Sequence, residues 1–277
     1  MSIGLREKGE RFRALHARPG AFVIPNPWDA GTARILAALG FEALTTTSAG
    51  LAFALGRRDG AGRITRDETL ANAKAVADAI DLPVAADLEN GFAETPAGVA
   101  ETIRLAGESA GLAGGSIEDA TGDPARPIYE LAEAVERITA AAEAARALLF
   151  PFVLVGRAEN FLHGRPDLGD TIRRLQAYEA AGADALYAPG VTKPDDIRAI
   201  CAAVGKPVNV VAGLRDDAFS VEQLAALGVR RISVGSTLAR AALGAFVRAA
   251  TEIRDRGTFT FAADAIPYAR AQEYMEP

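Results

Sequence analysis

Three acidic side chains stand near the ends of two neighbouring apolar runs and could hold a metal ion. Asp87 and Glu89 end the run PVAADLE (83–89), and Glu118 ends GGSIED (114–119). Residues two apart on a strand face the same side, so Asp87 and Glu89 could converge with Glu118. Three carboxylates need a cation in a low-dielectric pocket, and ligation by oxygen alone favours Mg2+ or Mn2+. The alternative is that they cap helices or pair with helix arginines.

Arg157 is the second candidate, because it stands inside the otherwise apolar run VLVGRAEN (153–160). A buried guanidinium needs an anionic partner, and its planar fork of donors fits a carboxylate. That carboxylate belongs either to a substrate or to the protein itself. A structural ion pair with Glu118 or Glu159 is the alternative to a substrate clamp.

Further polar groups follow other apolar runs. Thr47, Ser48, Ala49 and Gly50 offer hydroxyls and a turn whose backbone N–H groups could bind an anion. Asn209 lies in the run PVNVVAG (207–213). His163 could act as an acid or base, or be a surface-loop histidine. Cys201 falls in a predicted helix, where we expect it to pack.

Eight apolar, β-branched runs alternate with longer segments of helical period, which is typical of repeated βα units. The expected strands are 22–26, 43–47, 83–89, 114–119, 152–159, 185–190, 207–213 and 231–236. The expected helices are 29–39, 66–80, 97–110, 129–147, 167–181, 194–204, 217–227 and 237–256, with a leading helix at about 5–16. Several helices end in a glycine that can adopt the left-handed conformation.

The pattern predicts an α/β fold, a single (β/α)8 TIM-type barrel with an N-terminal helix and a C-terminal helical extension. An open doubly wound sheet has the same rhythm, but no GxGxxG follows the first strand, and eight units of even length favour closure. We expect one domain over 1–277, with a leading helix in 1–20, the barrel in 21–256 and an extension in 257–277. In such a barrel, catalytic residues come from the C-terminal strand ends.

Composition limits the classes of partner. The net charge is −6, and lysine and arginine are spread along the chain, so we expect no nucleic-acid binding. No run is long and apolar enough to span a membrane. The one cysteine and the charged N-terminal segment lead us to expect a cytoplasmic protein.

Four strings carry a resemblance to a known family: PNPWDAGTARILAALGFEALTTTSAG, PVAADLENGF, GGSIED and VGRAENF, in that order. They resemble the isocitrate lyase and phosphoenolpyruvate mutase superfamily over about residues 20–240. The resemblance implies an α/β barrel that makes or breaks C–C or P–C bonds next to the carbonyl of 2-oxo acids, using Mg2+ and an enolate-type intermediate.

The resemblance also implies roles for individual residues. Asp87 resembles the direct Mg2+ ligand, and Asp59, Glu89 and Glu118 resemble carboxylates that hold the metal through water. Arg157 resembles the arginine that meets the substrate carboxylate, and the segment from Ser48 to Gly50 resembles the turn that binds it through backbone amides. The expected catalytic residues are Arg157, Asp59 and Glu118. The expected substrate-binding residues are Thr47, Ser48, Ala49, Gly50, Asp87, Arg157 and Asn209.

One departure narrows the expected activity. Lyases of this superfamily carry a Lys-Lys/Arg-Cys-Gly-His stretch after strand four, and here the segment reads EDATGDPARPIYEL. The mutase and phosphonate-hydrolase branches use a longer polar gating loop with Lys and Asn, and the short loop here lacks that pattern too. We therefore do not expect isocitrate lyase, methylisocitrate lyase or phosphonomutase activity. We expect a Mg2+-dependent C–C lyase, decarboxylase or hydrolase of a small 2-oxo acid, in a homodimer or homotetramer that exchanges the C-terminal helix.

Two other functions stay open. One is a non-catalytic barrel that binds a metal and a 2-oxo acid. The other is an unrelated barrel isomerase that binds phosphate with the segments AGLRDD (212–217) and SVGSTLAR (233–240). Dialysis against a chelator separates them, since it would abolish ligand binding by the metal-dependent proteins only.

Overall fold

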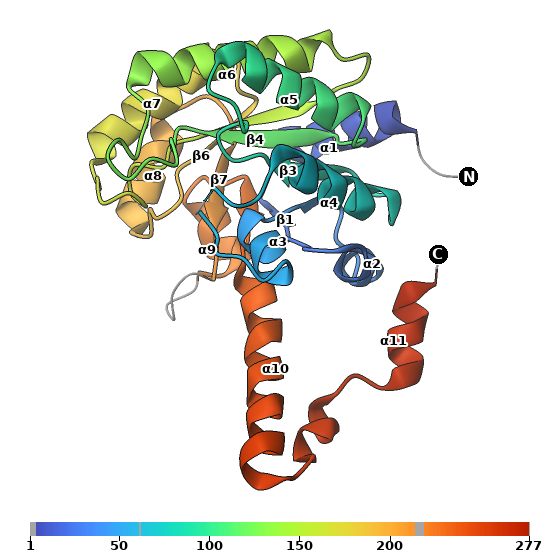
Figure 1. Cartoon of the computed structure of the whole chain (residues 1–277). Helices are drawn as coiled ribbons and strands as arrows, with labels where there is room; N and C mark the ends of the chain where they lie inside the picture. Colours follow the sequence, from blue (N-terminus) through green and yellow to red (C-terminus); the bar gives the residue numbers. More distant parts are fainter. Residues whose placement is uncertain (1–3, 61, 214–218, 277) are drawn as a thin grey trace.

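The computed structural model describes residues 4–60, 62–213 and 219–276, and its centre is a barrel of eight parallel strands (Figure 1). The strands are β1 (Phe22–Ile24), β2 (Leu44–Thr45), β3 (Val84–Asp87), β4 (Gly114–Glu118), β5 (Val153–Arg157), β6 (Ala185–Tyr187), β7 (Val208–Val211) and β8 (Arg231–Ser233). Each strand pairs with the next along the chain from β2 to β8, and β8 pairs with β1. The N–H of Thr45 donates to the carbonyl of Pro25 (3.1 Å) and joins β2 to the end of β1. The predicted (β/α)8 barrel is confirmed.

Helices surround the barrel and follow the strands in the order that the sequence predicts. They are α1 (Leu5–Ala17), α2 (Ala30–Ala38), α3 (Ser48–Ala54), α4 (Arg66–Asp78), α5 (Pro96–Glu108), α6 (Leu131–Ala147), α7 (Leu168–Ala180), α8 (Pro194–Ala203), α9 (Val221–Ala226) and α10 (Thr237–Arg256). Local sequence sets several starts: Asp29 and Thr32 form a capping box at α2, and Thr65 and Glu68 form another at α4.

The main core lies between the strands and these helices, and a smaller one closes the N-terminal end of the barrel. There Phe12 and Leu15 of α1 pack against Phe22 and Ile24 of β1. Gly114 shows how tight this end is, because a Cβ at that position would lie 2.6 Å from the carbonyl oxygen of Val153. The apolar strand bodies that the sequence shows are therefore buried on both sides.

The structure corrects three local predictions. The strand expected at 83–89 ends at Asp87, and Glu89 has a left-handed backbone with φ of 46°. The turn expected after strand two is the first turn of the helix α3, with Thr47 as its N-cap. The helix expected at 217–227 begins at Val221. Residues 214–218, which include most of AGLRDD, lie outside the described residues.

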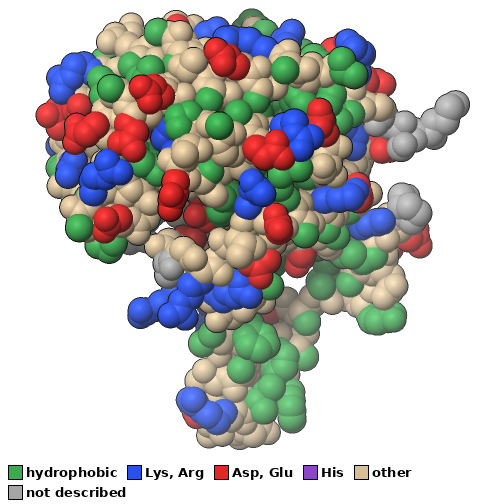
Figure 2. All heavy atoms as spheres, turned by 45° about the horizontal axis from the view of Figure 1, so that its top comes forward, with side chains coloured by type: hydrophobic (Ala, Val, Ile, Leu, Met, Phe, Trp, Pro, Cys, Tyr) green, Lys and Arg blue, Asp and Glu red, His purple; other side chains and the backbone are tan. Residues whose placement is uncertain are grey.

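The C-terminal segment leaves the barrel as an arm. Helix α10 extends away from it, and after the 3-10 helix η1 (Thr260–Asp264) the short helix α11 (Tyr268–Met275) returns to α2 (Figure 1). A guanidinium nitrogen of Arg34 donates to the carbonyl of Met275 (2.8 Å). Figure 2 shows hydrophobic side chains gathered on this arm. Its exposed large apolar residues are Leu238, Leu243, Phe246, Val247, Ile253, Phe259, Ile266, Tyr268 and Met275.

Within the described residues, no helix is both long and apolar enough to cross a membrane.

We expect Cys201 to have a packing role, and its substitution tests this expectation. It lies half-buried on α8 against the main core, and burial raises the pKa of its thiol to about 11. We predict that Cys201→Ser lowers the free energy of unfolding by on the order of 1 kcal/mol, because a hydroxyl replaces the thiol at this apolar site. Metal-dependent turnover should change by less than about threefold, which is under 1 kcal/mol. A folded but inactive variant would restore a cysteine-dependent mechanism.

Candidate active site

Two adjoining cavities open at the carboxyl ends of the strands. An inner pocket of about 210 Å3 enters the barrel, and an outer cleft of about 730 Å3 lies over the loops. Ser48, Asp59 and Arg157 line both. The predicted residues that line the inner pocket are Thr47, Ser48, Ala49, Asp59, Asp87, Arg157 and Asn209. Those that line the outer cleft are Ser48, Asp59, Glu89, Glu118, Arg157 and His163. Sequence reasoning thus selected side chains that the fold brings together.

Arg157 stands at the centre of the acidic groups. Its Nη1 lies 3.4 Å from Oδ1 of Asp87 and 3.2 Å from Oε2 of Glu118, and its Nε donates to Glu159. The guanidinium carbon lies 5.1 Å from the ring centroid of Tyr187, which is a cation–π contact. The structural alternative considered for Arg157 is therefore present, with Asp87 as an additional partner.

Four acids near Arg157, namely Asp59, Glu89, Glu118 and Glu159, have raised pKa values. Burial raises the pKa of Glu118 well above its ordinary value, and it also raises that of Glu159. Burial and then the charge of Asp87 raise the pKa of Asp59, and the same causes raise the pKa of Glu89 to about 7. One guanidinium does not balance this many acids, so the site favours a further cation.

Asp87 is the candidate for a direct metal ligand. It is the last residue of β3, and its Oδ2 accepts the N–H of Ser48 (3.3 Å) while its Oδ1 accepts the N–H of Glu89 (3.3 Å). In residues 4–60, 62–213 and 219–276, no three His, Cys, Asp or Glu side chains form a metal cluster by themselves. A Mg2+ ion characteristically keeps several waters and uses one or two protein carboxylates. An all-oxygen site with Asp87 as the direct ligand fits that habit.

The backbone after β3 holds Glu89 in place, although not as a strand residue. Its left-handed conformation is uncommon for a residue with a side chain and costs on the order of 1–3 kcal/mol. The surroundings impose it, because the Glu89 carbonyl accepts the N–H of Glu118 (2.9 Å). Strand alternation was therefore the wrong reason to expect Glu89 beside Asp87, and the two line different cavities.

The segment expected to bind an anion is partly engaged with the protein. The N–H of Ser48 donates to Asp87, and the N–H of Gly50 donates to Oγ1 of Thr47 (3.3 Å). Gly50 is buried, and a Cβ there would lie 2.5 Å from Cγ2 of Thr47. Thr47, Ser48 and Ala49 line the inner pocket directly.

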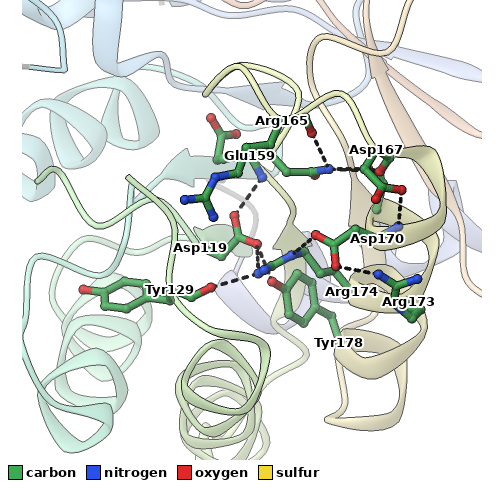
Figure 3. Close-up of polar contacts among 11 residues, drawn as sticks. Asp119, Tyr129, Glu159, Arg165, Asp167, Asp170, Arg173, Arg174 and Tyr178 are labelled. Atoms are coloured by element: carbon green, nitrogen blue, oxygen red, sulfur yellow. Dashed lines mark hydrogen bonds and ion pairs between the residues drawn. The ribbon is translucent and has the colours of Figure 1, made fainter. Parts of the chain in front are cut away.

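A buried network holds Glu159 from behind (Figure 3). The carboxylate of Asp119 accepts the N–H of Glu159 (2.7 Å), the hydroxyl of Tyr178 (2.6 Å) and Nη1 of Arg174 (3.0 Å). Arg174 also donates to the carbonyl of Tyr129 (3.0 Å). Asp119 thereby fixes the chain that carries the partner of Arg157. Asp119 directly follows the last residue of β4. Because successive side chains of a strand point to opposite faces, the sequence could have predicted that Asp119 points away from Glu118.

Two residues that line the cavities, Glu159 and Tyr187, were not among the predicted site residues. Glu159 appeared only as a possible structural partner of Arg157, yet it lines the outer cleft. Tyr187 was not selected, although it lines the inner pocket beneath Arg157. Tyr187 pairs with Arg157 on the neighbouring strand, so its side chain lies on the same face of the barrel wall.

Comparison with known proteins identifies the family. The model for phosphoenolpyruvate phosphomutase matches residues 12–254. The chain belongs to the phosphoenolpyruvate mutase family. This places it in the isocitrate lyase/phosphoenolpyruvate mutase superfamily, as the sequence motifs predict.

Individual relatives show how far this likeness extends. A solved structure described as a putative lyase/mutase of Burkholderia cenocepacia J2315 is 60% identical, with a TM-score of 0.95 over 99% of this chain and 97% of that chain. An oxaloacetate decarboxylase of Bradyrhizobium diazoefficiens is 31% identical over 82% of this chain and 78% of its own length. The structure of oxaloacetate acetylhydrolase in complex with the product oxalate is 26% identical, with a TM-score of 0.87 over 98% and 94% of the two chains. Two of these relatives of the mutase-family chain are named for enzymes that act on oxaloacetate.

The raised pKa of Glu89 predicts how stability depends on pH without metal. Its pKa is about 7 in the folded protein and close to 4.5 in the unfolded chain, so only the folded state keeps this proton between those values. The contribution of Glu89 to stability therefore falls as pH rises from 4.5 to 7. We expect Glu89→Gln to gain stability relative to wild type at pH 8 and not at pH 4.5, measured by urea unfolding with a chelator present. The exposed Glu94→Gln is the control, and equal shifts for both variants would contradict the assignment.

Proposed function

We propose that this protein is a Mg2+-dependent enzyme that cleaves a C–C bond next to the carbonyl of a small 2-oxo acid, by decarboxylation, lyase cleavage or hydrolysis. The observation that carries this proposal is the arrangement of Asp87, Glu118 and Arg157 at one mouth of the barrel. Acidic groups there suit a metal, and a guanidinium beside them suits the carboxylate of the substrate.

The proposed metal site uses Asp87 as the direct ligand, with Asp59, Glu89 and Glu118 as partners of the waters around the ion. Mg2+ would polarise the 2-oxo carbonyl and stabilise the negative charge that develops on its oxygen. Mn2+ has the same preference for oxygen ligands. Burial and, after it, the charges of neighbouring acids raise the pKa values of Glu89 and Glu118, and a bound cation would offset both effects.

Arg157 would hold the carboxylate of the substrate. Its Nη1 now contacts Asp87 and Glu118, and a cation held by Asp87 would compete with the guanidinium for that carboxylate and leave Nη1 for the substrate. Glu159 continues to hold Nε and keeps the guanidinium plane oriented toward the pocket. Thr47, Ser48 and Ala49 line the same pocket and would border that end of the substrate, with the buried Gly50 behind them, and Asn209 would bind the substrate from β7. Arg157, Asp59 and Glu118 are the proposed catalytic residues.

The loop after β4 supports cleavage without a cysteine. It runs from Thr121 to Ile128 with an isolated bridge between Ala120 and Ile128, and it carries neither cysteine nor histidine. We therefore propose no isocitrate lyase, methylisocitrate lyase or phosphonomutase activity. An oxaloacetate-like substrate needs only stabilisation of its enolate for decarboxylation, which the proposed site provides. His163 lines the outer cleft and is a candidate proton donor to the product.

The apolar arm supports a homodimer or homotetramer. Phe246 is 69% exposed and Tyr268 is 80% exposed, and such contiguous apolar surface is typical of protein interfaces. We propose that the arm is exchanged between subunits. A sedimentation velocity run that gives only monomer would contradict this.

The central test is turnover of a panel of C3 to C6 2-oxo and 2-hydroxy acids with and without Mg2+. We predict turnover of at least one 2-oxo acid, its loss on chelation, and its loss in Asp87→Ala with the fold intact, because Asp87 is a pocket ligand. Relief of repulsion could raise the stability of the metal-free variant. Unchanged Mg2+ and oxalate affinity in Asp87→Ala, by calorimetry, would refute the metal site. Binding of Mg2+ and oxalate without any turnover would favour the non-catalytic barrel.

Arg157→Lys tests the substrate clamp. A point ammonium cannot reproduce a two-donor fork, so we expect oxalate affinity at saturating Mg2+ to fall by about 1.5–3 kcal/mol, roughly ten- to a hundredfold. Mg2+ affinity should change little, because the positive charge is kept. A purely structural Arg157 predicts instead a lower melting temperature and weaker Mg2+ binding, with wild-type oxalate affinity once metal is saturating.

A further inference from the structure

Arg231 is a buried cation with no acidic partner inside the barrel. It is the first residue of β8, it is only 4% exposed, and it lines the inner pocket. Its Nε and Nη1 have no hydrogen-bond partner. Within the described part of the chain, no aspartate or glutamate forms an ion pair with Arg231. Burial lowers the pKa of its guanidinium, and the interaction with Tyr187 raises it. In the sequence, Arg231 is simply the first residue of the strand expected at 231–236, and no role was predicted for it.

The surroundings beneath Arg231 provide no negative charge. The ring of Phe12, on α1, lies 5.8 Å from its guanidinium carbon. His16 is buried there, and burial followed by the charge of Arg231 lowers its pKa to about 3. His16 is therefore neutral at pH 7, and burial likewise keeps the phenol of Tyr187 protonated by raising its pKa. Burial lowers the pKa of Arg231 itself only to about 10, so the guanidinium stays charged.

A row of residues in register connects Arg231 with the candidate active site. Arg157 pairs with Tyr187, Tyr187 pairs with Asn209, and Asn209 pairs with Arg231. Arg157 is the last residue of β5, whereas Arg231 is the first of β8, so the row descends from the mouth of the barrel toward its floor. All four side chains line the inner pocket.

The lower part of this row has unused hydrogen-bonding capacity. The side-chain N–H of Asn209 donates to the hydroxyl of Ser233 (3.0 Å), while its Oδ1 has no partner. The pocket thus carries a guanidinium at its mouth that is held by carboxylates, and a second guanidinium at its floor with free donors. A buried, uncompensated charge is costly, and a ligand that supplies the opposite charge removes the cost on binding.

We propose that Arg231 forms a second anion-binding subsite at the floor of the inner pocket, and that it takes the distal carboxylate of a dicarboxylic 2-oxo acid. This rests on the proposed function, in which the oxo-acid end of the same molecule is held at the metal and Arg157. Arg231 then determines specificity: a dicarboxylic substrate pairs both guanidinium groups, whereas a monocarboxylic one leaves the floor charge unpaired.

Binding of matched ligands to the full chain with saturating Mg2+ tests this subsite. Difluorooxaloacetate carries the distal carboxylate, 2-oxobutyrate has a methyl group in its place, and oxalate reports on the mouth alone. We expect Arg231→Met to weaken difluorooxaloacetate roughly ten- to a hundredfold, the range for a charged hydrogen bond. Affinities for oxalate and 2-oxobutyrate should stay within about twofold. The exposed Arg230→Met makes the same charge change one residue earlier and should leave all three affinities unchanged.

Thermal unfolding without ligand separates a binding role from a structural one. Arg231→Met should melt at or above the wild-type temperature, because it removes an unpaired buried charge. Arg231→Lys, which keeps the charge without the fork, should show an intermediate loss of difluorooxaloacetate affinity. A variant that is destabilised and weakened equally toward all ligands would mean that Arg231 is structural, and would overturn the proposal.

One other result would also overturn the proposed subsite. Wild-type difluorooxaloacetate affinity in Arg231→Met would mean that water or a small inorganic anion satisfies the guanidinium. A small inorganic anion, and not water, is the partner of Arg231 if chloride raises the melting temperature of the wild type and not that of Arg231→Met. Failure of the wild type to bind oxalate with Mg2+ would instead refute the proposed function, so the two failures are distinguishable.

Discussion

The charge balance around Arg157 is the constraint on which the rest of the site depends. Asp87, Glu118 and Glu159 all lie within ion-pair distance of one guanidinium, in a mouth where each is largely buried. Removal of water makes both their mutual repulsion and their attraction to the guanidinium stronger. Burial, and after it the charges of neighbouring acids, raise the pKa values of Glu89 and Glu118 even with Arg157 beside them. In the proposed function a divalent cation would complete this balance, and its binding would change which groups Arg157 can bind.

The barrel makes this balance possible by fixing the charged groups on separate strands. Glu118 and Arg157 are register partners on β4 and β5, and Asp87 ends the neighbouring β3. Behind them, the network of Asp119, Arg174 and Tyr178 satisfies a buried carboxylate with three donors and ties down the chain at Glu159 (Figure 3). This support matters because the hydrogen bonds between the planar guanidinium of Arg157 and a carboxylate are weakened by a small displacement of either group.

The sequence predicted the fold, and most of the site residues that it selected line the two cavities, because both depend on regular rules. Parallel strands bring their C-terminal ends together, so Asp87, Glu118 and Arg157 could be selected from strand position alone. Asp59 could not, since it stands in the loop after α3 without any periodic signal, and only the family resemblance selected it. The rule failed at Glu89, where the backbone leaves the strand.

The remaining misses have physical causes as well. Helix α3 is short, and the serine, alanine and glycine at its start look like a turn. Arg231 lies within an apolar run, where local pattern does not tell whether an arginine points to solvent or into a pocket. Whether it is paired depends on side chains of β6, β7 and α1, which lie far apart in the sequence.

The most direct test of the account is the coupling between Mg2+ and oxalate, measured by titration calorimetry of each ligand in the absence and presence of the other. If the cation frees Arg157 for the substrate carboxylate, each ligand must raise the affinity of the other by the same factor, as linkage requires. We predict a factor of at least about tenfold, or 1.4 kcal/mol, and no measurable oxalate binding in the presence of a chelator. Oxalate affinity that is the same with and without Mg2+ would contradict the account.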